Sequence, residues 1–474
     1  MSATLPPPCP EAPGSGPVKT SDHYDPRGTL TATILGSSLA FVLGSIINVG
    51  LPQMQADFDV GATGAQWIVN AYLLPLGALV LLGGALGDHR GRKRVFQAGL
   101  LLFAASCLLC AVAWSFPFLL AARALEGVAA AMIAPTSLAI IADAFHGPDR
   151  GRAIGTWAGV GAAAGAVAPV VGGVIVDTVG WRWAFVAVTP LALVAWWIAR
   201  DTVRESLSAP ETCAPLDLWG AILVSAGLFA LIWGLIALPD LGPSGLVTAA
   251  LAVGMALLSA FLAVEARLGD RAMTPLRLFQ NVSFSGLTAF TLFLYAALGG
   301  LMVLLPYVLI QGLGFSATAA GAAILPFPAV LAVLSRLTGG PLADRFGTRP
   351  LLVVGASFVA LGFFAFAQMP SQNVRYTLHV LPGLLALALG MSLSVAPLTA
   401  AVLNSAGERY AGVASGINNA ISRIGGLLAT ALLGIVLLQA DLLMAFALAA
   451  WAGVALAVMS AVIALATVRP APAP

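Results

Sequence analysis

Two side chains of opposite charge, Arg123 and Glu126, lie in an apolar segment of the sequence, RALEGVAAA (123–131). Because they are three positions apart, they share one face of a helix and can form an ion pair. A charge in apolar surroundings is costly unless it is paired, so the two residues mark a place with a specific role. Glu126 is either half of a structural ion pair or a cavity-facing carboxylate that carries a proton or holds a cationic group.

A second group of charged residues forms the segment GGALGDHRGRKR (83–94), which separates two long apolar runs. A related segment, GGPLADRFGTRP (339–350), aligns with it without gaps. The identical positions are Gly83/Gly339, Gly84/Gly340, Leu86/Leu342, Asp88/Asp344 and Gly91/Gly347. An Asp and a Gly three residues apart, beside arginines in both halves of the chain, indicate an internal duplication.

Asp88 can pair with Arg92 or with the positive N-terminal end of a helix in the other half of the chain. Asp344 and Arg345 would be its weaker counterparts in the second copy. The alternative is that the basic cluster is a topological anchor with no further role.

The composition points to a membrane protein. The chain has 474 residues, of which 59% are hydrophobic and 9% charged, with a mean hydropathy of +0.96. A soluble domain carries about 25% charged residues. The four cysteines suggest no disulfide or metal framework, and we interpret Cys107 and Cys110 as small packing residues inside a helix.

A membrane helix needs about 20 apolar residues, and the chain offers fourteen such runs. They lie near 30–51, 63–86, 95–113, 116–142, 151–176, 182–200, 216–238, 245–264, 282–310, 317–337, 350–369, 377–403, 411–437 and 442–467. Glu126 then lies about 15 Å into the fourth run, where a charge costs roughly 2.5–3.5 kcal/mol.

The arginines and lysines predict the orientation, because short cytoplasmic loops retain positive charge. With the N-terminus inside, 18 of the 22 lie in cytoplasmic segments, Arg182 and Arg375 lie outside, and Arg123 and Arg423 lie within spans. An even number of spans places the C-terminus inside as well. Trp114, Trp181 and Trp183 fall at the outer ends of spans, which predicts an aromatic belt.

The second copy of the charged segment follows the first by eight spans, so two spans are inserted between halves of six. We therefore expect an all-α polytopic membrane protein with a clear domain order. This is a disordered cytoplasmic tail (1–28), a six-helix bundle (29–205), two inserted helices with a linker (206–277), a second six-helix bundle (278–468) and a cytoplasmic tail (469–474).

These motifs resemble those of the major facilitator superfamily, and within it the fourteen-span drug:proton antiporters. GALGDHRGRKR is similar to the superfamily loop G-x-L-a-D-r-x-G-r-k-x, and RALEGVAAA to R-x-x-q-G-x-g-a-A on the fourth span. GAVAPVVGG (165–173) resembles the antiporter motif G-x-x-x-G-P-x-x-G-G on the fifth. SIINVGLP (45–52) and WRWAFVAVTP (181–190) resemble subfamily motifs of the first and sixth spans.

The resemblance implies the major facilitator fold and a role for each motif. Asp88, Gly91 and Arg92, with Asp344 and Arg345, would form a latch that steadies the closed cytoplasmic side. Gly165, Pro169, Gly172 and Gly173 would form the antiporter motif, for which tight packing alone is the alternative. The sequence departs from the family at Leu43, where an Asp is common, and at Glu126, where Gln is usual.

Glu126 is therefore the one carboxylate deep within a predicted span, and with Arg123 it is the candidate for proton coupling. The thirteenth span contains the segment SGINNAISRIGG (415–426). Its Arg423 is expected to contact substrate, to balance the charge of Glu126 in the other half of the chain, or to make structural hydrogen bonds. The polar candidates for lining a substrate cavity are Asn48, Asn70, Tyr72, Tyr295, Tyr307, Asn418 and Asn419.

The resemblance implies export of amphipathic or cationic organic compounds in exchange for protons, by alternating access. The alternatives are export of one specific metabolite or antibiotic, facilitated or proton-coupled uptake, and a membrane-embedded enzyme or sensor. We expect a multi-pass monomer in a bacterial plasma membrane, with both termini cytoplasmic. Its partners would be a small organic substrate, protons and the lipid bilayer, with no nucleic acid, cofactor or metal.

Overall fold

A computed structural model describes residues 25–206, 217–269, 272–338, 341–370, 372–407, 410–437 and 441–468. These residues form helices and short connections, and none of them is in a β-strand. Fourteen helical segments within the described ranges are long and apolar enough to cross a membrane. The predicted all-α class and the number of spans are confirmed. The predicted tails at 1–24 and 469–474 lie outside the described residues.

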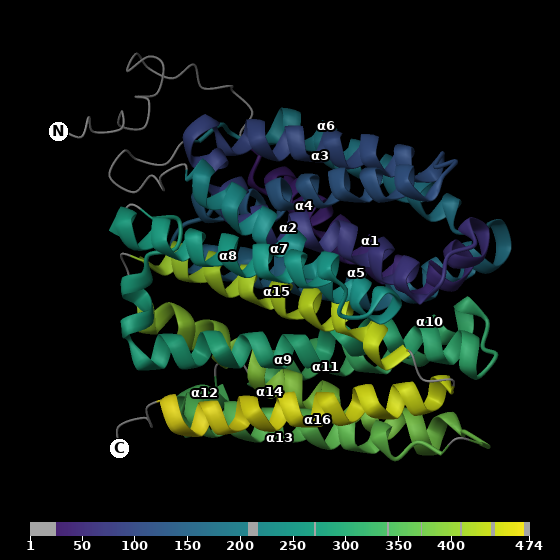
Figure 1. Cartoon of the computed structure of the whole chain (residues 1–474). Helices are drawn as coiled ribbons and strands as arrows, with labels where there is room; N and C mark the ends of the chain where they lie inside the picture. Colours follow the sequence, from purple (N-terminus) through teal and green to yellow (C-terminus); the bar gives the residue numbers. More distant parts are fainter. Residues whose placement is uncertain are drawn as a thin grey trace, which may run out of the picture.

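The first six helices form one bundle, drawn in purple and blue in Figure 1. They are α1 (Pro26–Phe58), α2 (Ala62–Arg90), α3 (Arg92–Ala111), α4 (Phe116–Ala144), α5 (Gly147–Val179) and α6 (Arg182–Thr202). Helix α1 begins before residue 29, because Asp25 caps its N-terminus by accepting a hydrogen bond from the backbone N–H of Arg27 and Pro26 takes the first helical position.

The second bundle is built from residues 282–467. It comprises α9 (Val282–Tyr307) with η3 (Val308–Gly312), α10 (Ala317–Ile324), α11 (Pro326–Thr338), α12 (Pro341–Phe346), α13 (Thr348–Ala367), η4 (Tyr376–Val380) with α14 (Leu381–Ala406), α15 (Ala411–Leu437) and α16 (Leu442–Thr467). Helices α10 and α11 form one span that breaks at Leu325, because Pro326 cannot donate the hydrogen bond that would continue the helix.

Two inserted helices, α7 (Leu218–Leu241) and α8 (Gly245–Leu268), lie between the bundles in the view of Figure 1. A short 3-10 helix, η2 (Leu276–Gln280), follows them and leads to α9. Helix α7 packs against α8 and also against α2 and α15, which belong to different bundles. Its residues Ile232 and Ile236 are fully buried against Leu427 and Ala431 of α15. The inserted pair therefore covers part of the seam between the bundles.

Small residues bring α2 and α4 into close contact. A side chain at Gly83 would collide with the carbonyl of Ala131, and one at Gly127 with the carbonyl of Tyr72. Such close backbone approach is common between membrane helices. It places Arg123, one turn before Gly127 on α4, against Ile68 and Tyr72 of α2, and Glu126 directly precedes Gly127.

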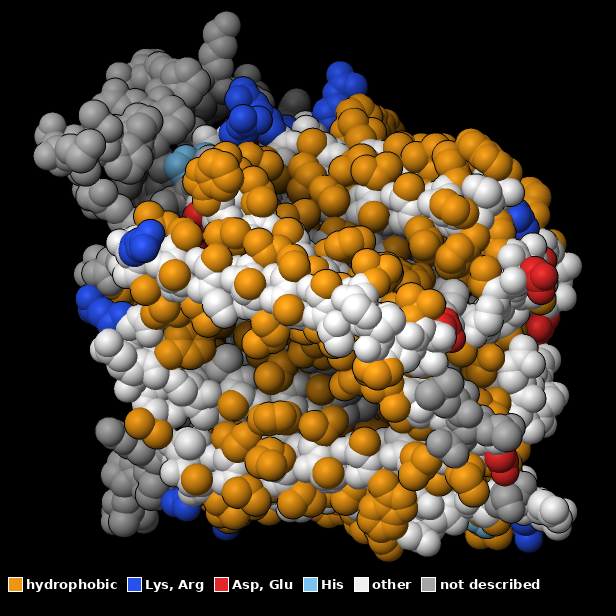
Figure 2. Space-filling model, in the orientation of Figure 1, with side chains coloured by type: hydrophobic (Ala, Val, Ile, Leu, Met, Phe, Trp, Pro, Cys, Tyr) orange, Lys and Arg blue, Asp and Glu red, His pale blue; other side chains and the backbone are white. Residues whose placement is uncertain are grey.

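The surface matches a lipid environment on its sides and water at its ends. Figure 2 shows hydrophobic side chains along the helices, with most Lys and Arg side chains at the left end of the view. Trp114 and Trp183 are 74% and 55% exposed, but Trp181 is 2% exposed. The aromatic-belt prediction is wrong for Trp181, because its ring packs against Phe58 and Phe185 and its N–H donates to Asp57.

Candidate functional site

The Arg123 and Glu126 side chains form a fully buried ion pair inside the first bundle. Arg123 Nη1 lies 2.8 Å from Glu126 Oε2, and the two residues are 1% and 0% exposed. The predicted i, i+3 contact is therefore present. In this conformation Arg123 of α4 and Cys110 of α3 lie against the carboxylate, and it is fully buried among the described residues.

Three neighbours complete the surroundings of the pair. Arg123 Nε donates to the carbonyl of Ile68 at 3.2 Å, and its guanidinium lies 4.6 Å from the centre of the Tyr72 ring. The Cys110 thiol is 3.9 Å from Glu126 Oε2, so this cysteine contacts the ion pair as well as filling space. Among the described residues, Glu126 Oε1 has no hydrogen-bond partner. The carboxylate thus retains one oxygen that could accept a proton.

Tyr72 and Arg423 connect this pair to the second bundle. The charge of Arg423, on α15, acts on the hydroxyl groups of both Tyr72 and Tyr295. The Cβ of Arg423 also packs against Gly77 of α2. Asn418, one turn earlier on α15, accepts a hydrogen bond from Thr291 at 2.7 Å, and Asn419 is partly exposed. The centre of the molecule therefore brings Glu126, Arg123 and Tyr72 into contact, and Arg423 packs against the same helix, α2, at Gly77.

Polar contacts join the two bundles at the end opposite the arginine-rich loops. Asn48 Nδ2 donates to the carbonyl of Met302 at 3.1 Å, and Thr430 Oγ1 donates to Asn70 Oδ1 at 2.5 Å. Gln66, which the sequence did not single out, donates to the carbonyl of Thr430 at 3.0 Å. These contacts close that end of the seam.

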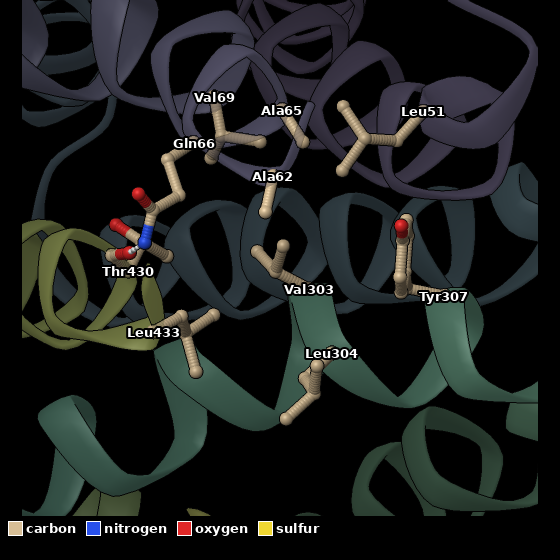
Figure 3. A pocket seen from close by; sticks show the side chains of 10 residues that line it. All are labelled: Leu51, Ala62, Ala65, Gln66, Val69, Val303, Leu304, Tyr307, Thr430 and Leu433. Atoms are coloured by element: carbon tan, nitrogen blue, oxygen red, sulfur yellow. Dashed lines mark hydrogen bonds between the residues drawn. The ribbon is translucent and has the colours of Figure 1, made fainter. Parts of the chain in front are cut away.

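An otherwise apolar pocket lies beside these contacts. Figure 3 shows Gln66 and Thr430 on one side of it, with aliphatic side chains and Tyr307 around the rest. Its lining comes from α1, α2, α9 and α15, and thus from both bundles. The residues are Leu51, Ala62, Ala65, Gln66, Val69, Val303, Leu304, Tyr307, Thr430 and Leu433.

The fifth helix also brings the two bundles into close contact. A side chain at Gly173 would collide with the carbonyl of Ala317, and one at Gly321 of α10 with the carbonyl of Pro169. Gly172 instead faces Ile46 of α1, and Gly165 is partly exposed. The small residues of the predicted antiporter motif thus pack α5 against both α1 and α10.

Asp177, near the end of α5, caps the start of α10. Its carboxylate accepts hydrogen bonds from the backbone N–H groups of Ala317 and Thr318, at 3.0 and 2.8 Å, and from the Thr318 hydroxyl at 2.6 Å. A carboxylate at a helix N-terminus is favourable because the free N–H groups carry partial positive charge. Sequence reasoning missed this residue, because its partners lie 140 positions later.

The charged segment between α2 and α3 forms a network within the first bundle. Arg92 lies 2.9 Å from Asp88 and 3.3 Å from Asp143, at the end of α4. Glu205 accepts a hydrogen bond from the backbone N–H of Lys93 and pairs with Arg94 at 3.5 Å. The Asp88–Arg92 pairing was one of two predicted options. Asp143 and Glu205 were not predicted, although each lies near the end of a span where arginines gather.

The second copy of this segment has the same backbone turn. Gly91 and Gly347 have φ angles of +106° and +78°, and each precedes the first residue of a helix. Only glycine adopts such angles readily, which explains why both copies have it. Arg345 is exposed, with its guanidinium 5.3 Å from the Phe346 ring. The Asp344 side chain lies outside the described part of the structure.

Two bundles of six membrane-crossing helices, with a repeated loop and contacts along their seam, define a polytopic transporter fold. The family model for the Major Facilitator Superfamily matches residues 33–430. This chain belongs to that superfamily.

Similar proteins include the multidrug resistance protein Stp of Mycobacterium tuberculosis, which is 32% identical over 86% of this chain and 75% of its own length. The cephamycin export protein CmcT of Amycolatopsis lactamdurans is 31% identical over 88% of this chain and 87% of its own length. The crystal structure of a peptide transporter POT in complex with sulfate superposes with a TM-score of 0.70 at 15% identity, covering 93% and 95% of the two chains. That likeness concerns the fold.

Proposed function

We propose that this protein exports amphipathic or cationic organic compounds from the bacterial cytoplasm in exchange for protons, by alternating access. Relatives named for multidrug resistance and for antibiotic export support the direction and the substrate class. The buried Glu126, with one oxygen on Arg123 and the other without a hydrogen-bond partner among the described residues, is the observation that carries the proton coupling.

Protonation of Glu126 would weaken its ion pair with Arg123 and so change the other contacts of Arg123. A neutral carboxyl group holds Arg123 less strongly, because the charge-assisted hydrogen bond between them is lost. Arg123 also binds the Ile68 carbonyl and stacks on Tyr72, whose hydroxyl lies in the field of Arg423. A proton on Glu126 would therefore change the contacts of α2 at the seam between the bundles, where Arg423 packs against this helix at Gly77.

The closed end of the seam would face the outside. The arginine-rich loops lie at the other end, and the positive-inside tendency assigns that end and both termini to the cytoplasm. Alternating access would then require the contacts of Asn48, Asn70 and Asp177 to open while the cytoplasmic ends approach. The charged segment around Asp88 would then act as the latch that stabilises the conformation closed at the cytoplasmic end and open to the outside.

The test uses inverted membrane vesicles with an imposed proton gradient. Addition of a cationic candidate compound should release protons in the wild type, seen as dequenching of a pH-sensitive dye, and Glu126→Gln should abolish the response. Gln retains a hydrogen bond to Arg123 and leaves no unpaired space, so binding of substrate should persist. Equal dequenching in both would move coupling away from Glu126. Passage of labelled compound without any proton signal would indicate a facilitator.

A further inference from the structure

Two carboxyl groups meet at the base of the inserted helix pair, away from the site described above. Asp217 is the residue that caps α7, and Glu265 lies in the last turn of α8. They are 7% and 0% exposed, and both carboxyl groups lie against Gly220. No motif of the sequence pointed to either residue.

Each carboxyl group has one oxygen held by a backbone donor. The N–H of Gly220 donates to Asp217 Oδ1 at 2.7 Å, and the N–H of Thr274 donates to Glu265 Oε2 at 2.6 Å. The other two oxygens, Asp217 Oδ2 and Glu265 Oε1, are buried and accept no hydrogen bond from a described donor. Both lie over Gly220, where a side chain would collide with them. The two oxygens thus point at one small space.

The described charges near this space give it no positive partner. Asp217 is the charged group that acts on Glu265. On the same helix Arg267 is exposed, and in η2 Arg277 lies with its guanidinium 5.8 Å from the Tyr410 ring. Asp270 and Arg271 lie outside the described residues. Two ionised carboxylates in contact repel strongly, and such pairs elsewhere in proteins share one proton.

We propose that Asp217 and Glu265 form a proton-binding site, in which a single proton bridges Asp217 Oδ2 and Glu265 Oε1. The proton replaces repulsion by a hydrogen bond, and the two backbone donors keep the remaining oxygens in place. The site ties the start of α7 to the end of α8 and, through Thr274, to the segment that leads into η2 and α9. It is separate from Glu126 and does not depend on the transport reaction.

Infrared spectroscopy of the purified protein tests the shared proton directly. The spectra are recorded in the Glu126→Gln background and in a detergent without ester groups, so that neither contributes a carbonyl band. A carboxylic acid band should be present at neutral pH and should disappear on alkaline titration. Both Asp217→Asn and Glu265→Gln should lose it, because one proton serves two groups. Absence of the band from the parent, or its persistence in either variant, overturns the proposal.

Thermal unfolding provides a second readout in the same proteins. The folded state holds a proton that the unfolded chain has released at neutral pH. The free energy of unfolding should therefore fall as pH rises, with the slope expected for one proton released on unfolding. Asp217→Asn and Glu265→Gln should lose this slope, since an amide N–H can replace the bridging proton. Asp149→Asn, which removes an exposed carboxylate paired with Arg152, should keep it.

The same titration distinguishes a proton from a metal ion. If sodium or calcium ions, added at constant pH, removed the carboxylic acid band of the parent protein, the site would be a cation site and the proton assignment would be wrong. No effect of either ion is the expected result.

Discussion

Individual residues at the centre of the molecule are constrained by close packing as well as by charge. Arg123 and Glu126 lie against α2 because Gly83 and Gly127 allow the backbones of α2 and α4 to approach. The ion pair alone would be expensive to bury, since both ions lose their hydration. Here Ile68 and Tyr72 of α2 add contacts that depend on this approach, and Cys110 of α3 adds a further contact from another side.

At this scale we expect Gly127→Ala to destabilise the protein by about 1–3 kcal/mol, because the added methyl group collides with the Tyr72 carbonyl. Gly155→Ala on α5 is the matched control. Nothing lies within 4 Å of the position its methyl group would take, and alanine favours a helix by up to about 1 kcal/mol. Thermal unfolding in detergent should separate the two variants. Equal unfolding temperatures would refute the packing argument.

At the scale of elements, α5 and α10 form a close contact between the bundles. Their backbones approach at Gly173 and Gly321, and Asp177 adds three hydrogen bonds at the start of α10. The two glycines allow the backbones to approach, and the hydrogen bonds to the Asp177 carboxylate stabilise the contact. The hydrogen bonds of Asn48 and Asn70 lie at the same end of the molecule. Several hydrogen bonds between the bundles therefore keep this end of the seam closed.

Asp177→Asn should shift the protein toward the state that is open on this side, because a neutral amide loses the attraction of the helix N-terminus. A cysteine placed at Val303, which lines the pocket of Figure 3, reports this in a chain without its four native cysteines. Labelling of whole cells by a membrane-impermeant maleimide should become several-fold faster.

Asp441→Asn is the control for that experiment. Asp441 also caps a helix at this end, because its carboxylate accepts a hydrogen bond from the N–H of Leu443 at 2.8 Å. The helix that it caps, α16, follows it directly in the second bundle, so this cap does not join the two bundles. Labelling at position 303 should keep its original rate. If the two variants accelerated labelling equally, the effect would come from lost helix caps in general, and Asp177 would not hold the bundles together.

At the scale of the whole molecule, the positions of the charges decide how the chain sits in the membrane. Most Lys and Arg side chains lie at one end of the helices in Figure 2, and both copies of the repeated loop belong to that end. The inserted pair does not disturb this arrangement, because two additional spans restore the original side. It adds α7 to the seam, with Ile232 and Ile236 against α15.

Reporter fusions should therefore place the arginine-rich end in the cytoplasm. Alkaline phosphatase, which is active only outside the cytoplasm, should be inactive when fused after Thr467 and active when fused after Gln368, which follows α13. A fluorescent protein should show the opposite pattern. Activity of the phosphatase at both positions would contradict the three spans that separate them, and the reverse pattern would contradict the orientation.

Much of this architecture follows from the order of residues along the chain. The fourteen apolar runs, the repeated loop with its two glycines and the i, i+3 spacing of Arg123 and Glu126 are local features, so sequence reasoning could predict them. Hydrophobicity and helical periodicity act over a few turns and need no knowledge of neighbours. The positive-inside pattern predicts the orientation in the same way.

Only the tertiary structure decided which side chains meet. Asp177 reaches Thr318, Asp217 meets Glu265, and Trp181 turns inward to Asp57, although nothing in the spacing of these residues along the chain relates them. Whether Glu126 faces a cavity or its own bundle depends on the rotation of α4 about its axis. That rotation is set by how α2, α3 and α4 pack, and a helix that is apolar on all sides carries no pattern from which to predict it.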